Sequence, residues 1–371
     1  MKLSSLDLPM FFDAAQLALG TRLMESITEA DPALHVPKEV IPRLATLGFL
    51  ELLVPKGPMS VRSLCLAREA LAYVSGLADS IFAVQGLGSH PIVLTPAFPE
   101  RDRLLAEVVG GTRVCAFALT EPEAGSDVAS MRTTARRDGS DWVLDGEKVF
   151  ISNVGIARHF IVFANADPPS KKGISAFLVD AEAEGLTLAP MPLSVEHPLG
   201  RLTMKHCRVP ESALLGEVGH GLRLALGTLD VFRTSVGAAA VGMARRALDE
   251  TIARVKSREQ FGQKLALFQL TQAAIAEMAT ELDAARLLVY RAAWHKDHDP
   301  QSREGTNVAM AKMFATEAAQ RIIDRAVQLH GGSGVLEGSV VERLYREIRP
   351  LRIYEGTTEI QKLIIGGALT K

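Results

Sequence analysis

Cysteine is scarce in this sequence, and the few cysteines present exclude two classes of small stabilised protein. Only Cys65, Cys115 and Cys207 occur among 371 residues, widely separated and without a C-x-x-C spacing. A disulfide framework and a cysteine-ligated metal cluster are therefore excluded. The nine histidines show no HExxH or other paired-ligand spacing, so no metal site is expected. This composition fits a reducing, cytoplasmic environment.

An excess of charge of one sign is also lacking. The 41 basic and 43 acidic residues give a formal net charge of -2. Such a balance argues against a surface that binds nucleic acid. We therefore expect a small molecule as the partner.

Long apolar runs are missing as well. No uninterrupted apolar stretch reaches the roughly 18 to 20 residues that a membrane span needs. The apolar segment at the start of the chain is broken by Asp7, Pro9 and Asp13, so it does not look like a signal peptide. A Walker phosphate loop is absent, and the glycines near residue 331 follow a predicted helix rather than a strand, which disfavours a Rossmann nucleotide fold. We expect a cytoplasmic protein without a membrane partner.

Hydrophobic periodicity divides the chain into three parts. Residues 1–112 repeat their apolar positions at helical spacing. Residues 113–217 change to short β-rich runs with Asp-Gly and Lys-Gly turns between them. Over residues 218–371 the helical period returns in long segments that can form an antiparallel bundle. The sequence thus predicts a multidomain α+β fold with an N-terminal helical domain, a middle β domain and a C-terminal helical domain.

Three short segments carry the chemistry. Near the end of the chain, Glu355 stands between an aromatic residue and a glycine in residues 352–361, RIYEGTTEIQ. Residues 118–127 read ALTEPEAGSD, and residues 328–334 read QLHGGSG. Together these segments resemble the acyl-CoA dehydrogenase flavoprotein family.

The resemblance extends over nearly the whole chain from about residue 35 and is strongest over residues 115–155 and 230–365. It implies an N-terminal α domain, a middle β-barrel or sandwich domain and a C-terminal four-helix bundle, with FAD as the cofactor. It also implies an acyl-CoA substrate and an electron-transfer flavoprotein that reoxidises the flavin. The assembly that it implies is a homo-oligomer, a dimer or a homotetramer, that acts in fatty acid metabolism.

Dehydrogenation between Cα and Cβ of a thioester needs two acceptors. A carboxylate can take the α-proton while flavin N5 takes the β-hydride, and hydrogen bonds to the thioester carbonyl stabilise the enolate-like charge. The resemblance makes Glu355 the base and assigns its N–H to that carbonyl. Some branches of the family carry the base at the position of Phe232, which cannot accept a proton, so Glu355 stands alone. Without this context, a glutamate near a helix start is most often a surface acid.

The surroundings of Glu355 raise two further expectations. Burial beside a substrate would raise its pKa, whereas Arg233 or a nearby helix N-terminus would lower it, and the sequence leaves this balance open. Gly356 permits a backbone conformation that a β-carbon would obstruct. Thr358 and Gln361 predict a capping box that opens the last helix.

The first flavin segment is the loop at residues 118–127. It offers backbone N–H groups, hydroxyls and a tight turn, although alone it could be an ordinary turn of a β domain. By the resemblance, Phe117, Leu119 and Thr120 edge the flavin, and Ser126 helps to hold both cofactor and substrate.

A second flavin segment follows at residues 146–153. Phe150 stands where the family commonly has Trp, and Ser152 stands where it has Thr. The hydroxyl is retained, so a hydrogen bond to flavin N5 stays possible, while phenylalanine lacks the indole N–H and some stacking area. A plain β-strand is the alternative interpretation of this segment.

Other cofactor contacts are implied from a neighbouring subunit. Arg258 and Phe261 resemble a segment in which an arginine pairs with the flavin pyrophosphate, although alone they would be a helix end and a turn. Gln328 and Gly332 match positions that bind the adenosine half of FAD, although paired glycines are also a helix C-cap signal. The implied cofactor set is completed by Thr357 and Glu359.

The implied substrate residues come from several segments. Arg233 positions the catalytic loop, and Tyr354 lines the thioester end of the pocket. Asp230 contacts the pantetheine or nucleotide part of the acyl carrier. One face of the helical segment before Pro91 is expected to line the acyl pocket. The full set is Leu87, Ser126, Asp230, Arg233, Tyr354 and Gly356, with Asp79, Ser80 and Ala83 as further positions on the helical face.

Two alternative functions stay open. The same fold could serve an acyl-CoA oxidase, a flavin monooxygenase or a dehydrogenase acting on acyl-carrier protein, although the retained Glu355 disfavours a monooxygenase. A noncatalytic acyl-binding protein is the other alternative. The intact base, Arg233 and the flavin loops argue against it.

Overall fold

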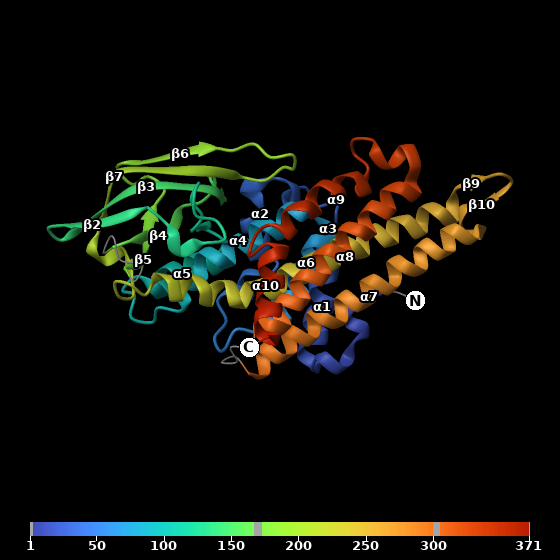
Figure 1. Ribbon diagram of the computed structural model, residues 1–371, viewed down its shortest axis with the longest axis horizontal. Helices are drawn as coiled ribbons and strands as arrows, with labels where there is room; N and C mark the ends of the chain where they lie inside the picture. Colours follow the sequence, from blue (N-terminus) through green and yellow to red (C-terminus); the bar gives the residue numbers. More distant parts are fainter. Residues whose placement is uncertain (1–2, 167–172, 300–304, 371) are drawn as a thin grey trace. The chain divides into compact units, whose positions relative to one another are not determined.

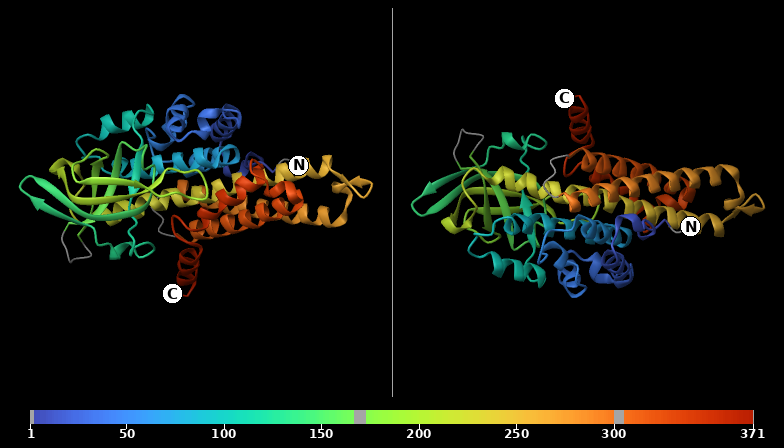
Figure 2. Two further views of the ribbon diagram at one scale, coloured as in Figure 1. Left: turned by 90° about the horizontal axis from the view of Figure 1, so that it is seen from above. Right: turned by 90° about the horizontal axis from the view of Figure 1, so that it is seen from below.

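The computed structural model describes residues 3–166, 173–299 and 305–370, and the chain divides into two compact units. Each unit is assembled from segments that are far apart in the sequence. In the first unit, N-terminal segments lie beside the orange helix α7 (Gln269–His298) of the C-terminal half (Figures 1 and 2). The first unit comprises Met1–Asp31, Ser60–Asp79 and Arg233–Lys371, and the second comprises Pro32–Met59 and Ser80–Phe232.

The predicted order of a helical, a β and again a helical region is confirmed. The predicted boundaries at residues 112 and 217 stay a prediction, because they describe continuous domains and the two units do not follow continuous segments.

Long helices build the first unit. The C-terminal part of α6 (Gly221–Ser257) contacts α7 (Gln269–His298) and α8 (Gly305–His330), and α7 and α8 run side by side in Figures 1 and 2. The other α-helices of the unit are α1 (Ala14–Ser26), α3 (Val61–Val74), α9 (Val340–Ile348) and α10 (Thr358–Leu369). The strands β9 (Glu259–Gln260) and β10 (Gln263–Lys264) form a hairpin.

Small residues let α6 approach its neighbours closely. A β-carbon added to Gly242 would lie 2.3 Å from the carbonyl oxygen of Glu69 in α3, and one added to Gly237 would lie 2.8 Å from Val289 in α7. Contacts at this range exclude any larger side chain at these two positions. By length and composition α6 could also cross a membrane, but 67% of its most apolar window is buried, as in the core helix of a folded protein.

The second unit is built around a mostly antiparallel sheet. Its strands lie in the order β6-β7-β3-β2-β4-β5-β8, and β1 pairs in parallel with β4. The helices α2 (Pro37–Thr46) and α5 (Arg101–Val109) and most of α4 (Gly76–Val93) belong to this unit. The strands are β1 (Cys115–Ala118), β2 (Thr134–Asp138), β3 (Asp141–Ser152), β4 (His159–Asn165), β5 (Ile174–Asp180), β6 (Leu186–Pro190), β7 (Leu199–Pro210) and β8 (Leu214–Leu215).

Strand β4 holds the centre of this unit. All of its residues are buried, because both faces of the strand are covered. Phe160 and Val162 join one apolar cluster, and Ile161 and Phe163 join another, as the alternation of side chains along a strand requires. The short β-rich runs expected over residues 113–217 are confirmed by β3, β4 and their neighbours.

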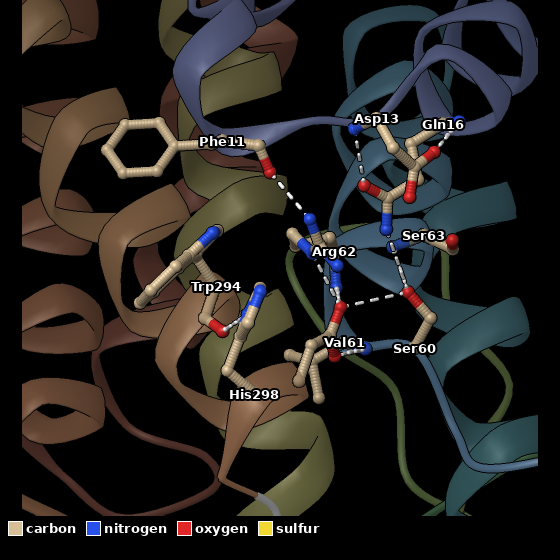
Figure 3. Close-up of polar contacts among 10 residues, drawn as sticks. Phe11, Asp13, Gln16, Ser60, Val61, Arg62, Ser63, Trp294 and His298 are labelled. Atoms are coloured by element: carbon tan, nitrogen blue, oxygen red, sulfur yellow. Dashed lines mark hydrogen bonds and ion pairs between the residues drawn. The ribbon is translucent and has the colours of Figure 1, made fainter.

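One carboxylate ties three distant segments of the first unit together. Asp297 in α7 accepts hydrogen bonds from the backbone N–H of Val61 (2.5 Å), from the Ser60 hydroxyl (3.0 Å) and from Arg62 Nε (2.7 Å). Arg62 Nη1 donates to the carbonyl of Phe11 at 2.8 Å, as Figure 3 shows. The N-terminus of α3 is therefore capped by another helix, and the start of the chain is fastened to it.

Removal of this carboxylate should destabilise the first unit. Asp297→Ala leaves the buried N–H of Val61 and the Arg62 guanidinium without their acceptor, so we expect the free energy of unfolding to fall by about 2 to 4 kcal/mol. Urea denaturation followed by circular dichroism measures this. The exposed Asp299→Ala, two residues on, is the control, and equal midpoints for the two variants would contradict the capping role.

Candidate active site

Glu355 lies in a strained loop of the first unit. The loop joins a 3-10 helix, Arg349–Arg352, to α10, and both Glu355 (φ 54°) and Gly356 (φ 91°) have left-handed backbone conformations. Glycine adopts such a φ freely, but for glutamate it costs of order 1 to 3 kcal/mol. The sequence suggested this freedom only for Gly356, so the strain at Glu355 is new.

Two cations hold the loop by its carbonyl groups. Arg233 Nε donates to the carbonyl of Glu355 at 3.0 Å, and Lys312 Nζ donates to the carbonyl of Gly356 at 2.8 Å. The Gln361 side chain adds a second bond to Gly356 at 2.9 Å. The contact of Arg233 with the loop fits the positioning role predicted for it, and Lys312 is a partner that sequence reasoning missed.

The predicted capping box at Thr358 and Gln361 is wrong. The N-cap of α10 is Thr357, whose hydroxyl accepts from the N–H of Ile360. Thr358 instead donates to Glu317 at 2.7 Å, and Gln361 turns back to Gly356. The helix starts one residue earlier than the capping pattern indicated, because two neighbouring threonines offer the same chemistry.

Burial decides the charge balance at Glu355. Desolvation raises the pKa of its carboxyl group, although Arg68, Arg233 and Lys312 each oppose the rise, and Asp79 adds to it. Its Oε2 atom is buried and has no hydrogen-bond partner among the described residues. A carboxylate in this state is poorly solvated and is therefore a stronger base than an exposed one.

A buried ion pair stands behind this carboxylate. Arg68 is fully buried and binds both oxygens of Asp79, with Nε to Oδ1 and Nη2 to Oδ2 each at 2.8 Å, and it also donates to Ser235 at 3.2 Å. Arg68 binds the carboxylate of Asp79, and the expected place of Asp79 on the wall of the acyl pocket stays a prediction. Burial also raises the pKa of Tyr354 well above its usual value, so its phenol stays neutral.

The sequence does contain a signal for Arg68 and Lys312, the two cations near Glu355 that were not predicted. Arg68 lies among the apolar positions of α3, and Lys312 lies on the buried stripe of α8. A charged residue in an apolar stripe needs a buried partner, because an unpaired buried charge is costly. The pattern points to such a partner but does not say which residue it is.

A second buried ion pair shapes the first flavin loop, in the second unit. Lys148 Nζ binds Glu121 Oε1 at 2.7 Å and donates to the carbonyl of Leu119 at 3.1 Å. Glu121 also accepts the N–H groups of Arg132 and Thr133 at 2.6 and 3.0 Å. Burial lowers the pKa of Lys148 to about 8, against the attraction of Glu121. Both residues lie in the quoted segments, yet their pairing was not anticipated.

The second flavin segment contains a bulge that turns Phe150 outward. The pairing of β3 with β7 shifts register between Lys148 and Ile151, and Phe150 has φ 57° with 61% of its surface exposed. Asn153 (φ 66°) ends the segment, with its side-chain amide donating to the carbonyl of Cys115 at 2.9 Å. A bulge of this kind redirects a side chain at a functional edge.

The remaining candidate residues of the second unit lie in varied surroundings. Leu119 and Leu87 are buried, Phe117, Thr120 and Asp230 are half-buried, and Ser126 is exposed. Phe232 is fully buried and packs edge-on against His90, with ring centroids 5.7 Å apart, so it is a core residue.

The residues expected to reach a neighbouring subunit are exposed. Phe261, at the tip of the β9–β10 hairpin, has φ 52° and is 94% exposed. Arg258, Gln328 and Gly332 are exposed as well, and so is Glu359, which was predicted to bind the cofactor without assignment to a neighbouring subunit. A large apolar ring left in water on a strained turn fits a contact made with another molecule, and the contact itself stays a prediction.

Comparison with known proteins agrees with this arrangement. Residues 116–207 match the family description "Acyl-CoA dehydrogenase, middle domain", and residues 219–370 match "Acyl-CoA dehydrogenase, C-terminal domain". A subunit of the caffeyl-CoA reductase–Etf complex of Acetobacterium woodii is 36% identical over 97% of this chain and 96% of its own length. The chain belongs to the acyl-CoA dehydrogenase family.

Other relatives and solved structures support the membership. The 3-(aryl)acrylate reductase of Clostridium sporogenes is 36% identical over 92% of this chain and 93% of its own. Butyryl-CoA dehydrogenase from Megasphaera elsdenii superposes with a TM-score of 0.90 at 31% identity, covering 97% of this chain and 99% of that one. Glutaryl-CoA dehydrogenase of Mycobacterium smegmatis, in complex with FADH2, has a TM-score of 0.90 at 30% identity, covering 98% and 96%. The predicted family, fold and class of FAD-dependent oxidoreductase acting on CH–CH bonds are confirmed.

Loss of the Lys148 ammonium should leave Glu121 buried without its counter-ion. We expect Lys148→Met to lower the free energy of unfolding by about 3 to 5 kcal/mol. Adding Glu121→Gln should recover part of the loss, because the uncompensated charge is then gone. Thermal and urea unfolding measure both effects. Lys205→Met, at an exposed position, is the control, and a Lys148→Met variant as stable as this control would contradict the role of the pair.

The raised pKa of Glu355 predicts a stability change that depends on pH. Ionised Glu355 is less favourable in the folded than in the unfolded protein, so its contribution is lost as pH rises from the ordinary value of 4.5 through the folded pKa. Glu355→Gln should therefore be more stable than the parent protein at neutral pH, and the difference should shrink toward pH 4. Unfolding curves across this range test it, with exposed Glu337→Gln as control. A stability difference that grows toward low pH would mean that the pKa of Glu355 is lowered by folding, which would contradict the prediction.

Proposed function

We propose that this protein is an FAD-dependent acyl-CoA dehydrogenase in which Glu355 removes the α-proton of an acyl-CoA thioester. The observation that carries the proposal is the buried Oε2 of Glu355, which has no hydrogen-bond partner among the described residues, on a loop held by Arg233 and Lys312. An unpaired buried carboxylate has no structural benefit, because burial of such a group costs free energy. Its position on a pinned, strained loop fits a base kept ready for a substrate.

The residues of the second unit fit a planar cofactor. The backbone at Leu119 is anchored by Lys148, and Val149 N–H donates to the carbonyl of Thr120 at 3.0 Å. Phe150 presents an exposed aromatic ring from the bulge. Phe117, Leu119, Thr120, Phe150 and Ser152 would hold the flavin. FAD, when bound, supplies the hydride acceptor for the β-carbon.

The chain itself carries the proton chemistry. Glu355 must be ionised to accept the α-proton, and its raised pKa increases its basicity once the substrate has displaced water. Arg233 and Lys312 keep the loop in place while the carboxylate changes charge. The N–H of Glu355 would stabilise the negative charge that develops on the thioester oxygen. The same groups serve the reverse reaction, because proton removal and proton return share one transition state.

The substrate and the electron partner are proposed from the relatives. The Acetobacterium protein belongs to a caffeyl-CoA reductase–Etf complex, and another relative, 34% identical, is a cyclohexane-1-carbonyl-CoA dehydrogenase. We extend to this chain an acyl-CoA substrate and an electron-transfer flavoprotein as partner. A cytoplasmic homo-oligomer, a dimer or a tetramer, acting in fatty acid metabolism, completes the proposal.

The exposed Phe261 hairpin supports the oligomer. Analytical ultracentrifugation of Phe261→Asp tests it, because the variant should sediment with a smaller mass than the parent assembly.

Replacing the base tests the proposed chemistry directly. Glu355→Gln keeps the size of the side chain and removes its basicity, so we expect the rate of flavin reduction by acyl-CoA to fall by about 10² to 10⁴-fold. Stopped-flow absorbance with a panel of acyl-CoAs measures this, and an unchanged flavin spectrum of the variant shows that the cofactor site is intact. Glu337→Gln is the control. Full activity in Glu355→Gln would remove the assignment.

An oxidase acting on an acyl-carrier protein is the second candidate. A prolyl acyl-carrier-protein oxidase superposes with a TM-score of 0.89 at 25% identity, covering 97% of this chain. Peroxide release with oxygen as the acceptor, and activity on an acyl-carrier-protein thioester, would favour this function. Turnover that requires an electron-transfer flavoprotein and releases no peroxide would favour the dehydrogenase.

A further inference from the structure

A histidine in the second unit bridges two serine hydroxyls. His197 lies between β6 and β7, with Nε2 2.7 Å from Ser152 Oγ and Nδ1 3.1 Å from Ser80 Oγ. Ser152 is the last residue of β3, and Ser80 lies in α4. The imidazole thus joins three segments that are separated in the sequence. From the sequence, Ser152 was predicted at the flavin and Ser80 on the helical face of the acyl pocket, and His197 was not among the predicted site residues.

The ring of His197 is neutral under ordinary conditions. Burial lowers its pKa to about 4, and its two ring nitrogens are occupied by hydroxyls rather than by carboxylates. A neutral imidazole has one N–H donor and one nitrogen acceptor, whereas a hydroxyl can do either. The two serines must therefore make hydrogen bonds of opposite polarity to this ring.

The tautomer of His197 determines what Ser152 offers to any other partner. With the hydrogen on Nε2, Ser152 Oγ accepts from the ring, and its own O–H is available as a donor. With the hydrogen on Nδ1, the O–H of Ser152 is used on Nε2, and Oγ can only accept from another group. Ser80 takes the complementary role at the far end of the ring.

We propose that His197 is a positioning residue that lets Ser152 serve the cofactor as a hydrogen-bond donor in one redox state and as an acceptor in the other. The inference rests on the proposed function and on the expectation that Ser152 would hydrogen-bond flavin N5 once FAD is bound. N5 would accept a hydrogen bond in the oxidised cofactor and would donate one in the reduced cofactor. An exchange of tautomer matches Ser152 to both states without moving a heavy atom.

The proton count of the group stays constant in this exchange. In each arrangement the ring carries one proton and each serine carries one. Nε2 passes its proton to Ser152, whose own hydroxyl proton leaves to water, and Nδ1 takes the hydroxyl proton of Ser80, which water replaces. The group therefore takes up no net proton, and its net charge does not change.

Nitrogen NMR of the holoprotein tests the exchange. The two ring nitrogens of ¹⁵N-labelled histidine have different shifts when protonated and unprotonated, and the His197 signals are identified by their loss in His197→Asn. We expect the Nε2–H tautomer with oxidised FAD and the Nδ1–H tautomer after reduction with dithionite. The same tautomer in both states, or a doubly protonated ring, would overturn the inference.

Reduction potential provides a second readout that a purely structural role of His197 would not change. The amide of His197→Asn cannot exchange donor and acceptor by tautomerisation, so it favours one redox state. We expect the ratio of the affinities for oxidised and reduced FAD to change by about two- to tenfold, the value of one neutral hydrogen bond, seen as a shift in midpoint potential. His206→Asn is the matched control, because His206 is exposed and its left-handed backbone suits asparagine.

Ser80→Ala keeps the inference testable if His197→Asn does not fold. It removes the hydroxyl at Nδ1, leaves the contact with Ser152, and should abolish the change of tautomer on reduction. A protein that binds no FAD would overturn both the proposed function and this inference. A yellow protein that is reduced by acyl-CoA, but whose potential is the same in the parent, His197→Asn and Ser80→Ala forms, would overturn the inference alone.

Discussion

The hold of two cations on the carbonyl groups of a single loop is the interaction on which the candidate active site depends. The left-handed backbone at Glu355 costs of order 1 to 3 kcal/mol, and a hydrogen bond from a charged donor contributes about 1.5 to 3 kcal/mol. The bonds from Arg233 and Lys312 are thus sufficient to offset the strain. They act on the backbone and leave the carboxylate unpaired, which is what a base needs.

Each unit has a buried ion pair at or near a loop of the candidate site. Arg68 with Asp79 lies in the first unit, and Lys148 with Glu121 lies in the second. Buried pairs contribute little net stability, because desolvation offsets most of their attraction. Their value here is geometric: one of them places a fully buried cation near the Glu355 carboxylate, and the other anchors the backbone at Leu119. A hydrophobic pair of equal volume would fill the same space, but it would neither place a charge near Glu355 nor hold the backbone at Leu119.

Backbone strain marks the same places as the chemistry. Among the described residues, five other than glycine have positive φ, and three of these, Phe150, Phe261 and Glu355, were candidate site residues on sequence grounds alone. Each occupies a different kind of structure, namely a bulge, a hairpin tip and a loop before a helix. In each case the surrounding hydrogen bonds hold a conformation that a free chain would avoid. The coincidence supports these three assignments independently of any resemblance.

The sequence by itself determined the order of helical and β regions and the family, and it singled out Glu355 as the proposed base, because these follow from local periodicity and from short motifs. It also predicted that Arg233 positions the Glu355 loop, which its hydrogen bond to the Glu355 carbonyl fits. Tertiary structure alone decided that Glu355 has a left-handed backbone, that burial outweighs three cations in setting its pKa, and that Asp79 pairs with Arg68. It alone brought His197 to Ser152. Each of these depends on contacts between side chains distant in sequence, and the free energy of such contacts comes from burial and geometry that no local pattern records.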